Sequence, residues 1–150
     1  MSEVLFYHLE GQPLERVLPA LLEKTVERGW RAVVETSSRE RATAIDTMLW
    51  SYRDDSFLPH GIAGEDTDPD QPVLITMDDG NANTANVRFF VDRAVPQSGG
   101  SYDRIVYLFS GHDPDAVSEA RIAWKALQDG NTLTYWQQDE NGRWVKKASA

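Results

Sequence analysis

The fold is decided by residues 4–34, VLFYHLEGQPLERVLPALLEKTVERGWRAVV. Residues 4–9 are a short apolar and aromatic run, which is typical of a buried strand. From Pro13 to Gly29 apolar residues recur at spacings of three and four, which predicts a helix with one buried face that ends at the glycine. Residues 32–34 predict a second strand, so the stretch indicates a β-α-β unit with a right-handed crossover between parallel strands.

The patterns that follow extend this unit into a larger α/β domain. A second helix is expected after Ser37 or Ser38, either of which can cap it. A third is expected over residues 113–129, between the Asp113 cap and Gly130. Further strands are predicted at residues 73–77, 87–91, 105–109 and 132–137, with residues 143–145 returning in a hairpin around Asn141-Gly142. We therefore expect one domain over residues 1–150, a three-layer α/β/α sandwich around a mostly parallel or mixed sheet, Rossmann-like without a nucleotide site.

Composition narrows the classes of function. The formal net charge is −9, which opposes general affinity for DNA because phosphate contacts need clustered Lys and Arg. There is no cysteine, and therefore no disulfide framework or thiolate metal site. No signal peptide and no apolar run of the roughly 20 residues that cross a bilayer is found, so a soluble cytoplasmic protein is expected.

Few residues indicate catalysis or a cofactor. The loop after the first strand, residues 10–14, holds one glycine instead of the G-x-G-x-x-G that brings a backbone close to a pyrophosphate. Asp78 and Asp79 follow a predicted strand and could hold magnesium, but Asp-Asp-Gly is also an ordinary turn sequence, which we favour. A small magnesium- or nucleotide-dependent enzyme using Asp78, Asp79 and His60 is the alternative; otherwise no cofactor and no metal is expected.

One face of the third predicted helix suits a peptide ligand. Ala116, Ala120, Ala123 and Leu127 make its core stripe, and Val117, Arg121, Trp124 and Lys125 make the neighbouring stripe. Arg can clamp a carboxylate and Lys adds a point charge, while Trp and Val can line an apolar pocket. The alternative is a solvated helix face with Trp124 tucked into the core.

Residues 50–64 predict an irregular loop that is unusually aromatic. Trp and Tyr are enriched at interface hot spots, so Trp50 and Phe57 could form a partner surface. They could equally plug the bottom of the sheet, and periodicity does not decide between the two.

With these residues in view, the chain resembles the chi subunit family of DNA polymerase III over residues 4 to about 136. The resemblance is carried by Phe6-Tyr7, Leu49-Trp50, Ser56-Phe57-Leu58-Pro59-His60, Ala63-Gly64-Glu65, Ala120-Arg121 and Trp124-Lys125-Ala126. The chain departs from the family at Trp124, where Tyr is common, and at Val117, where Lys is common. Residues 138–150 extend beyond the match.

The resemblance implies a non-catalytic adaptor in the bacterial replication machinery. Chi connects the clamp loader, through the psi subunit, to the acidic C-terminal tail of single-stranded DNA-binding protein, which ends in several Asp followed by Ile-Pro-Phe. The resemblance also implies that the tail is bound by Val117, Arg121, Trp124 and Lys125, and that psi is faced by Trp50 and Phe57. It implies neither direct DNA binding nor membrane contact.

Overall fold

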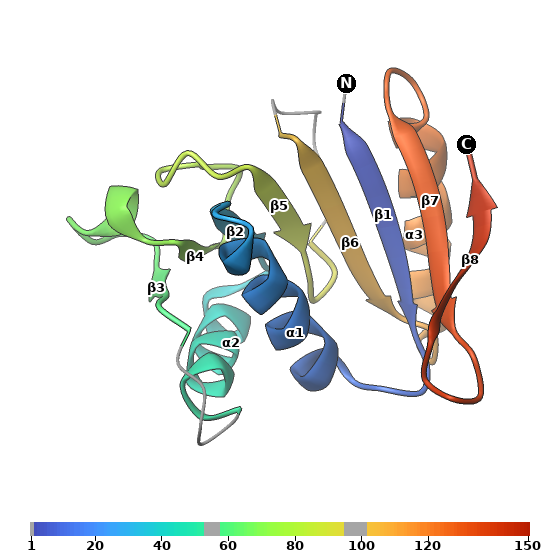
Figure 1. Cartoon of the computed structure of the whole chain (residues 1–150), viewed down its shortest axis with the longest axis horizontal. Coiled ribbons are helices and arrows are strands. Elements are labelled where there is room, and N and C mark those ends of the chain that lie inside the picture. Colours follow the sequence, from blue (N-terminus) through green and yellow to red (C-terminus); the bar gives the residue numbers. More distant parts are fainter. Residues whose placement is uncertain (1, 53–57, 95–101) are drawn as a thin grey trace.

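The computed structural model describes residues 2–52, 58–94 and 102–150, and these form a mixed sheet with helices on both faces (Figure 1). The strands are β1 (Glu3–Leu9), β2 (Ala32–Glu35), β3 (Gly61–Ile62), β4 (Val73–Thr76), β5 (Val87–Phe90), β6 (Arg104–Ser110), β7 (Thr132–Gln138) and β8 (Trp144–Ser149). Their order across the sheet is β3-β4-β2-β5-β6-β1-β7-β8, parallel throughout except for the antiparallel β7–β8 pair.

The helices are α1 (Leu14–Glu27), α2 (Arg39–Ser51) and α3 (Pro114–Leu127), with a short 3₁₀ turn, η1, at Asp68–Asp70. α1 and α2 cover one face of the sheet and α3 covers the other, so the three-layer α/β/α sandwich is confirmed (Figure 1). Right-handed crossovers explain this division. The chain moves one way along the sheet from β1 to β2 and the opposite way from β6 to β7, so the two crossover helices lie on opposite faces.

Strand β1 contributes side chains to both halves of the core, one on each face of the sheet. Its alternate residues point to opposite layers, as the pleat requires. Val4 and Phe6 pack in the cluster under α3, whereas Leu9 belongs to the cluster under α1 and α2, with Tyr7 at its margin. α3 contributes small residues to its cluster, Ala116, Ala120 and Ala123, together with Leu127.

The helix ends follow the sequence signals. Gly29 adopts φ +82° after α1 and Gly130 adopts φ +81° after α3, in the left-handed region that favours glycine. Of the two serines before α2, Ser38 is the cap, and its hydroxyl accepts from the Arg41 N–H. The Asp113 carboxylate caps α3 by accepting from Asp115 and Ala116.

The expectation of an irregular loop over residues 50–64 is partly wrong. Trp50 lies in the last turn of α2, because the buried Leu49 keeps that turn packed against the sheet. Gly61–Ile62 is a strand, β3, paired with Leu74 and Ile75 of β4. The acidic stretch 65–71 also has order, because the Asp68 carboxylate accepts from the N–H groups of Gly64 and Glu65.

A buried ion pair between Arg88 of β5 and Glu35 of β2 lies on the face of the sheet that α3 covers further along. The connection from β4 to β5 crosses β2 on the α3 face, where Arg88 is 3% exposed. Its Nε and Nη2 both donate to Glu35 Oε1. The other donors fix the connecting loop, with Nη1 donating to the Gly80 carbonyl at 2.8 Å and Nη2 to the Asp78 carbonyl at 2.6 Å. Burial raises the pKa of Glu35, and the hydrogen bond from Arg88 opposes that rise.

We predict that Arg88→Met lowers the free energy of unfolding by about 3–5 kcal/mol, because Glu35 then stays buried without its partner. Urea denaturation followed by circular dichroism measures the change. Arg93→Met is the control, since the Arg93–Glu119 ion pair is exposed and should matter far less. Equal stability of the Arg88 variant and the wild type would contradict this role.

Candidate functional site: the α3–β7 surface

The four predicted tail-binding residues lie on one side of α3. Val117, Arg121 and Trp124 follow each other at spacings of four and three, and Lys125 lies one turn after Arg121. Val117 and Trp124 are half-buried, whereas Arg121 and Lys125 are exposed. The helix therefore presents two cations beside a partly accessible apolar surface.

Trp124 is held by aromatic contacts from two strands. Its ring meets Phe6 of β1 edge-on at 5.2 Å between centroids, and Tyr135 of β7 edge-on at 5.9 Å. Tilted and edge-to-face pairs of this kind are favourable beyond their buried area. Trp124 is therefore packed against the core cluster and is half-buried as a residue.

The charge of this surface is opposite to that of the chain. Within the described parts of the chain neither Arg121 nor Lys125 makes an ion pair. Burial raises the pKa of the Tyr135 hydroxyl; the positive charge of Arg121 opposes the rise, and the negative charge of Glu10 adds to it. On a protein of net charge −9, two cations beside a half-buried Trp124 have the chemistry to bind a carboxylate with an apolar neighbour.

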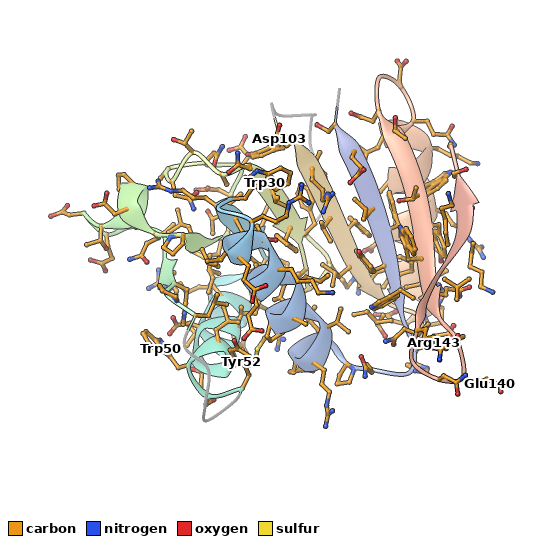
Figure 2. The ribbon with its side chains drawn as sticks, viewed as in Figure 1. Trp30, Trp50, Tyr52, Asp103, Glu140 and Arg143 are labelled. Atoms are coloured by element: carbon orange, nitrogen blue, oxygen red, sulfur yellow. The ribbon has the colours of Figure 1, made fainter. Side chains whose placement is uncertain are left out.

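Trp50 forms a second exposed aromatic surface on the other face of the sheet. Its side chain is 56% exposed at the end of α2, and Figure 2 shows it far from the β7–β8 hairpin. Its ring lies 4.5 Å from that of His60, whose side chain is fully buried. His60 is fixed by Leu58 O at 2.7 Å from Nδ1 and by Asp46 Oδ1 at 3.1 Å from Nε2. Phe57, the other predicted interface residue, lies outside the described residues.

The Asp78-Asp79 pair is a turn. The Asp78 carboxylate accepts from the Gly80 N–H and the Thr76 hydroxyl, each at 2.8 Å, and these bonds, the backbone one first, lower the pKa of Asp78. His60 contacts Asp46 instead of these carboxylates. Residues 2–52, 58–94 and 102–150 contain no cluster of three side chains able to hold a metal ion.

A cavity of about 600 Å³ lies at the carboxyl ends of β1 and β6, beside the loop 10–14. This is the position at which open α/β sheets bind ligands, since crossovers leave these two strands in opposite directions. Its two arginines are already paired with carboxylates: Arg41 Nε lies 3.0 Å from Asp92 Oδ2, and Arg93 Nη2 lies 2.5 Å from Glu119 Oε2. The positive charge there is neutralised within the chain.

Sequence reasoning missed the position of Tyr135 on this surface and its contact with the buried His8. Leu133 and Tyr135 are two residues apart on β7, and both side chains point toward α3. The two-residue period of a strand could therefore have placed Tyr135 on this face. Its contact with His8 joins residues 127 positions apart, and no local pattern marks it.

Comparison with known proteins agrees with this architecture. The family described as DNA polymerase III chi subunit, HolC, matches residues 1–134. The chain therefore belongs to the DNA polymerase III chi subunit family. This family is one of non-catalytic accessory subunits. No helix of the described residues is long and apolar enough to span a membrane.

Two curated relatives are similar to the chain. A probable DNA polymerase III subunit chi of Rickettsia prowazekii (strain Madrid E) is 26% identical over 87 residues, which are 58% of this chain and 53% of that protein. The DNA polymerase III subunit chi of Pseudomonas aeruginosa (strain PAO1) is 25% identical over 111 residues, 72% of this chain and 77% of that protein. The chain thus spans about half the length of the first relative.

The C-terminal domain of the DEAD-box protein Dbp5 has a similar structure. The TM-score is 0.53 at 13% identity, over 91% of this chain and 90% of that one. At this identity the similarity concerns the fold alone.

Proposed function

We propose that the chain, as one chi-like domain over residues 1–150, links the clamp loader to single-stranded DNA-binding protein in the cytoplasm. One end of this link is the acidic C-terminal tail of single-stranded DNA-binding protein, and the other is the psi subunit. DNA contact is left to the partners, because the chain carries a net charge of −9.

The observation that carries the tail-binding half is the pairing of Arg121 and Lys125 with a half-buried Trp124 on an acidic protein. A guanidinium can bind a carboxylate through two parallel N–H donors, and the ammonium adds a second charge. Val117 and Trp124 form the apolar wall beside them. A peptide that places Asp residues next to an apolar end matches both features.

The clamp-loader half rests on Trp50. A large aromatic side chain that is 56% exposed and seated on a buried His60 has the chemistry of an interface anchor. Trp50 belongs to α2 and the tail surface to α3, so the sheet lies between the two proposed surfaces (Figure 1). Both partners could then be bound at once. Phe57 completes this proposed surface by resemblance.

We predict that a peptide ending in Asp-Asp-Ile-Pro-Phe binds the chain, and that Arg121→Ala weakens binding by about 1–3 kcal/mol, the scale of a hydrogen bond to a charged group. Isothermal titration measures both. The affinity should fall steeply with salt, because the ion pairs are exposed and screened.

Arg39→Ala is the matched control, since Arg39 is an exposed helical arginine on α2, across the sheet. It should leave peptide affinity unchanged. Absence of wild-type binding at low salt would refute the tail-binding proposal, and equal effects of the two substitutions would move the site away from α3.

We predict that Trp50→Ala weakens binding to the psi subunit by about tenfold or more, as expected for truncating an interface aromatic anchor. Surface binding kinetics measure it. The melting temperature and tail-peptide affinity should stay close to wild type, because more than half of the Trp50 surface is exposed.

Ile122→Ala is the control for psi binding, because Ile122 is 70% exposed but lies on α3. Unchanged psi affinity of the Trp50 variant would overturn this interface. Loss of the folded state in that variant would assign Trp50 to the core.

A further inference from the structure

The face of the sheet that α1 and α2 cover is open at one end. In the described part of the chain no helix lies over β1, β7 and β8 on this side, whereas α3 covers β1 and β7 from the other side (Figure 1). Tyr7 of β1 and Trp136 of β7 are neighbours in the strand pairing, and Trp144 of β8 meets Tyr7 edge-on at 4.8 Å. All three rings are half-buried on the α1 side. Sheets normally bury both faces, so this is an unpartnered face.

A groove of about 420 Å³ borders this face, between α1 and the strands β1 and β6. Leu21 and Lys24 of α1 line one side of it, together with Arg28 at the end of that helix. Figure 2 shows Trp30 at one end, near the start of β6, and Arg143 at the other end, in the connection between β7 and β8. The groove and the three aromatic rings together form the α1–β8 surface.

Both sides of the α1–β8 surface carry positive charge. Lys24 and Arg28 lie on the α1 side, and Lys146 lies on the β8 side, because it is paired with Trp136 and shares its face. Within the described residues none of these three cations makes an ion pair. Glu27 is the one carboxylate among the described residues that line the groove. The surface is thus basic at both edges on a chain of net charge −9.

The open face has the dimensions of one helix. Neighbouring strands lie about 4.8 Å apart, so β1 and β8 are separated by about 10 Å, and a helix with its side chains is about 10–12 Å across. β1 and β7 are each 7 residues long, which is about 23 Å, the length of a helix of about 15 residues. A single helix laid along β1 and β7 would complete the layer that α1 and α2 begin.

We propose that the α1–β8 surface is the docking site for an amphipathic helix of a partner protein that carries Asp or Glu on both sides of its apolar face. The apolar face packs on Tyr7, Trp136 and Trp144, and the flanking carboxylates meet Lys24 and Arg28 on one side and Lys146 on the other. Cations on both edges of an aromatic groove are complementary to that pattern and to no other arrangement of charge on a helix.

The aromatic residues favour a protein helix over a single-stranded nucleic acid. Bases stack on the open faces of aromatic rings. Here Tyr7 and Trp144 are joined edge-on with 78° between their planes, and the Trp136 indole N–H already donates to Thr134 Oγ1 at 2.8 Å. The rings therefore offer a shaped apolar surface with no donor left to satisfy. The net charge of −9 also opposes a phosphate backbone.

This docking site is separate from the two surfaces of the proposed function. It shares no residue with the α3 surface or with Trp50. Trp136, Trp144 and Lys146 lie beyond residues 1–134, which match the family. Binding at the α1–β8 surface can therefore be measured independently of tail binding.

Fluorescence anisotropy with two synthetic peptides of about 15 residues, each cross-linked to hold it helical, tests the proposal. Both carry leucines at spacings of three and four along one face, flanked by Glu in one peptide and by Lys in the other. The wild-type chain should bind the Glu-flanked peptide at least about tenfold more tightly than the Lys-flanked one. Trp144→Ala should weaken binding of the Glu-flanked peptide about tenfold, the scale for an interface aromatic.

Charge reversal tests the edges of the groove. Lys24→Glu should weaken binding of the Glu-flanked peptide, and Lys24→Glu combined with Lys146→Glu should make the chain prefer the Lys-flanked peptide. Arg39→Glu is the matched control, because Arg39 is also an exposed helical cation but lies on α2, outside the groove. It should leave the preference of the wild type unchanged, and all these variants should keep wild-type affinity for the tail peptide.

The proposal is overturned if neither helical peptide binds, if the two bind equally, or if charge reversal leaves the preference unchanged. Binding of a labelled oligothymidylate that Trp144→Ala abolishes would assign the surface to single-stranded nucleic acid instead. Self-association of the chain in sedimentation velocity that Trp144→Ala abolishes would assign it to a second copy. Circular dichroism checks that each variant is folded, and if Trp144→Ala is not, the charge reversal alone decides.

Discussion

The parallel pairing of β1 with both β6 and β7 is the constraint on which the rest of the structure depends. β1 lies between these strands, so α3, which connects them, has to cross over it. Phe6 and His8 of β1 point into that crossover, where Phe6 meets Trp124 and His8 meets Tyr135. Trp124 and Tyr135 of the α3–β7 surface come from different elements, and both contact residues of β1. A change in the register of β1 would separate them.

The same topology suits the adaptor role proposed for the chain. Crossovers in opposite directions place α2 and α3 on opposite faces, so Trp50 and the cations of α3 are kept apart by the sheet (Figure 1). On the part of this face that α3 does not cover, Arg88 pairs with Glu35 and holds the β4–β5 connection against the sheet. Binding energy is then expected from two localised surfaces, one basic and aromatic and one aromatic.

Much of the fold could be predicted from the sequence because its signals are local. The alanine stripe of α3, its Asp113 cap and Gly130 define that helix completely. The placement of Trp50 was mistaken because no glycine or proline marks the true end of α2. The burial of Arg88 and the contact of Tyr135 with His8 were beyond reach, since each depends on strands that only the long-range pairing brings together. The four α3 residues were proposed correctly as neighbours, but their partner from β7 was not found.

The central claim is that the surface formed by α3 and β7 binds an acidic peptide tail. Mapping of amide chemical shifts during titration of ¹⁵N-labelled chain with a peptide ending in Asp-Asp-Ile-Pro-Phe tests it most directly. The account predicts that the perturbed amides gather over α3 and β7, with those of α2 and β3 unchanged. Perturbations centred on α2, or on the cavity beside the loop 10–14, would contradict it.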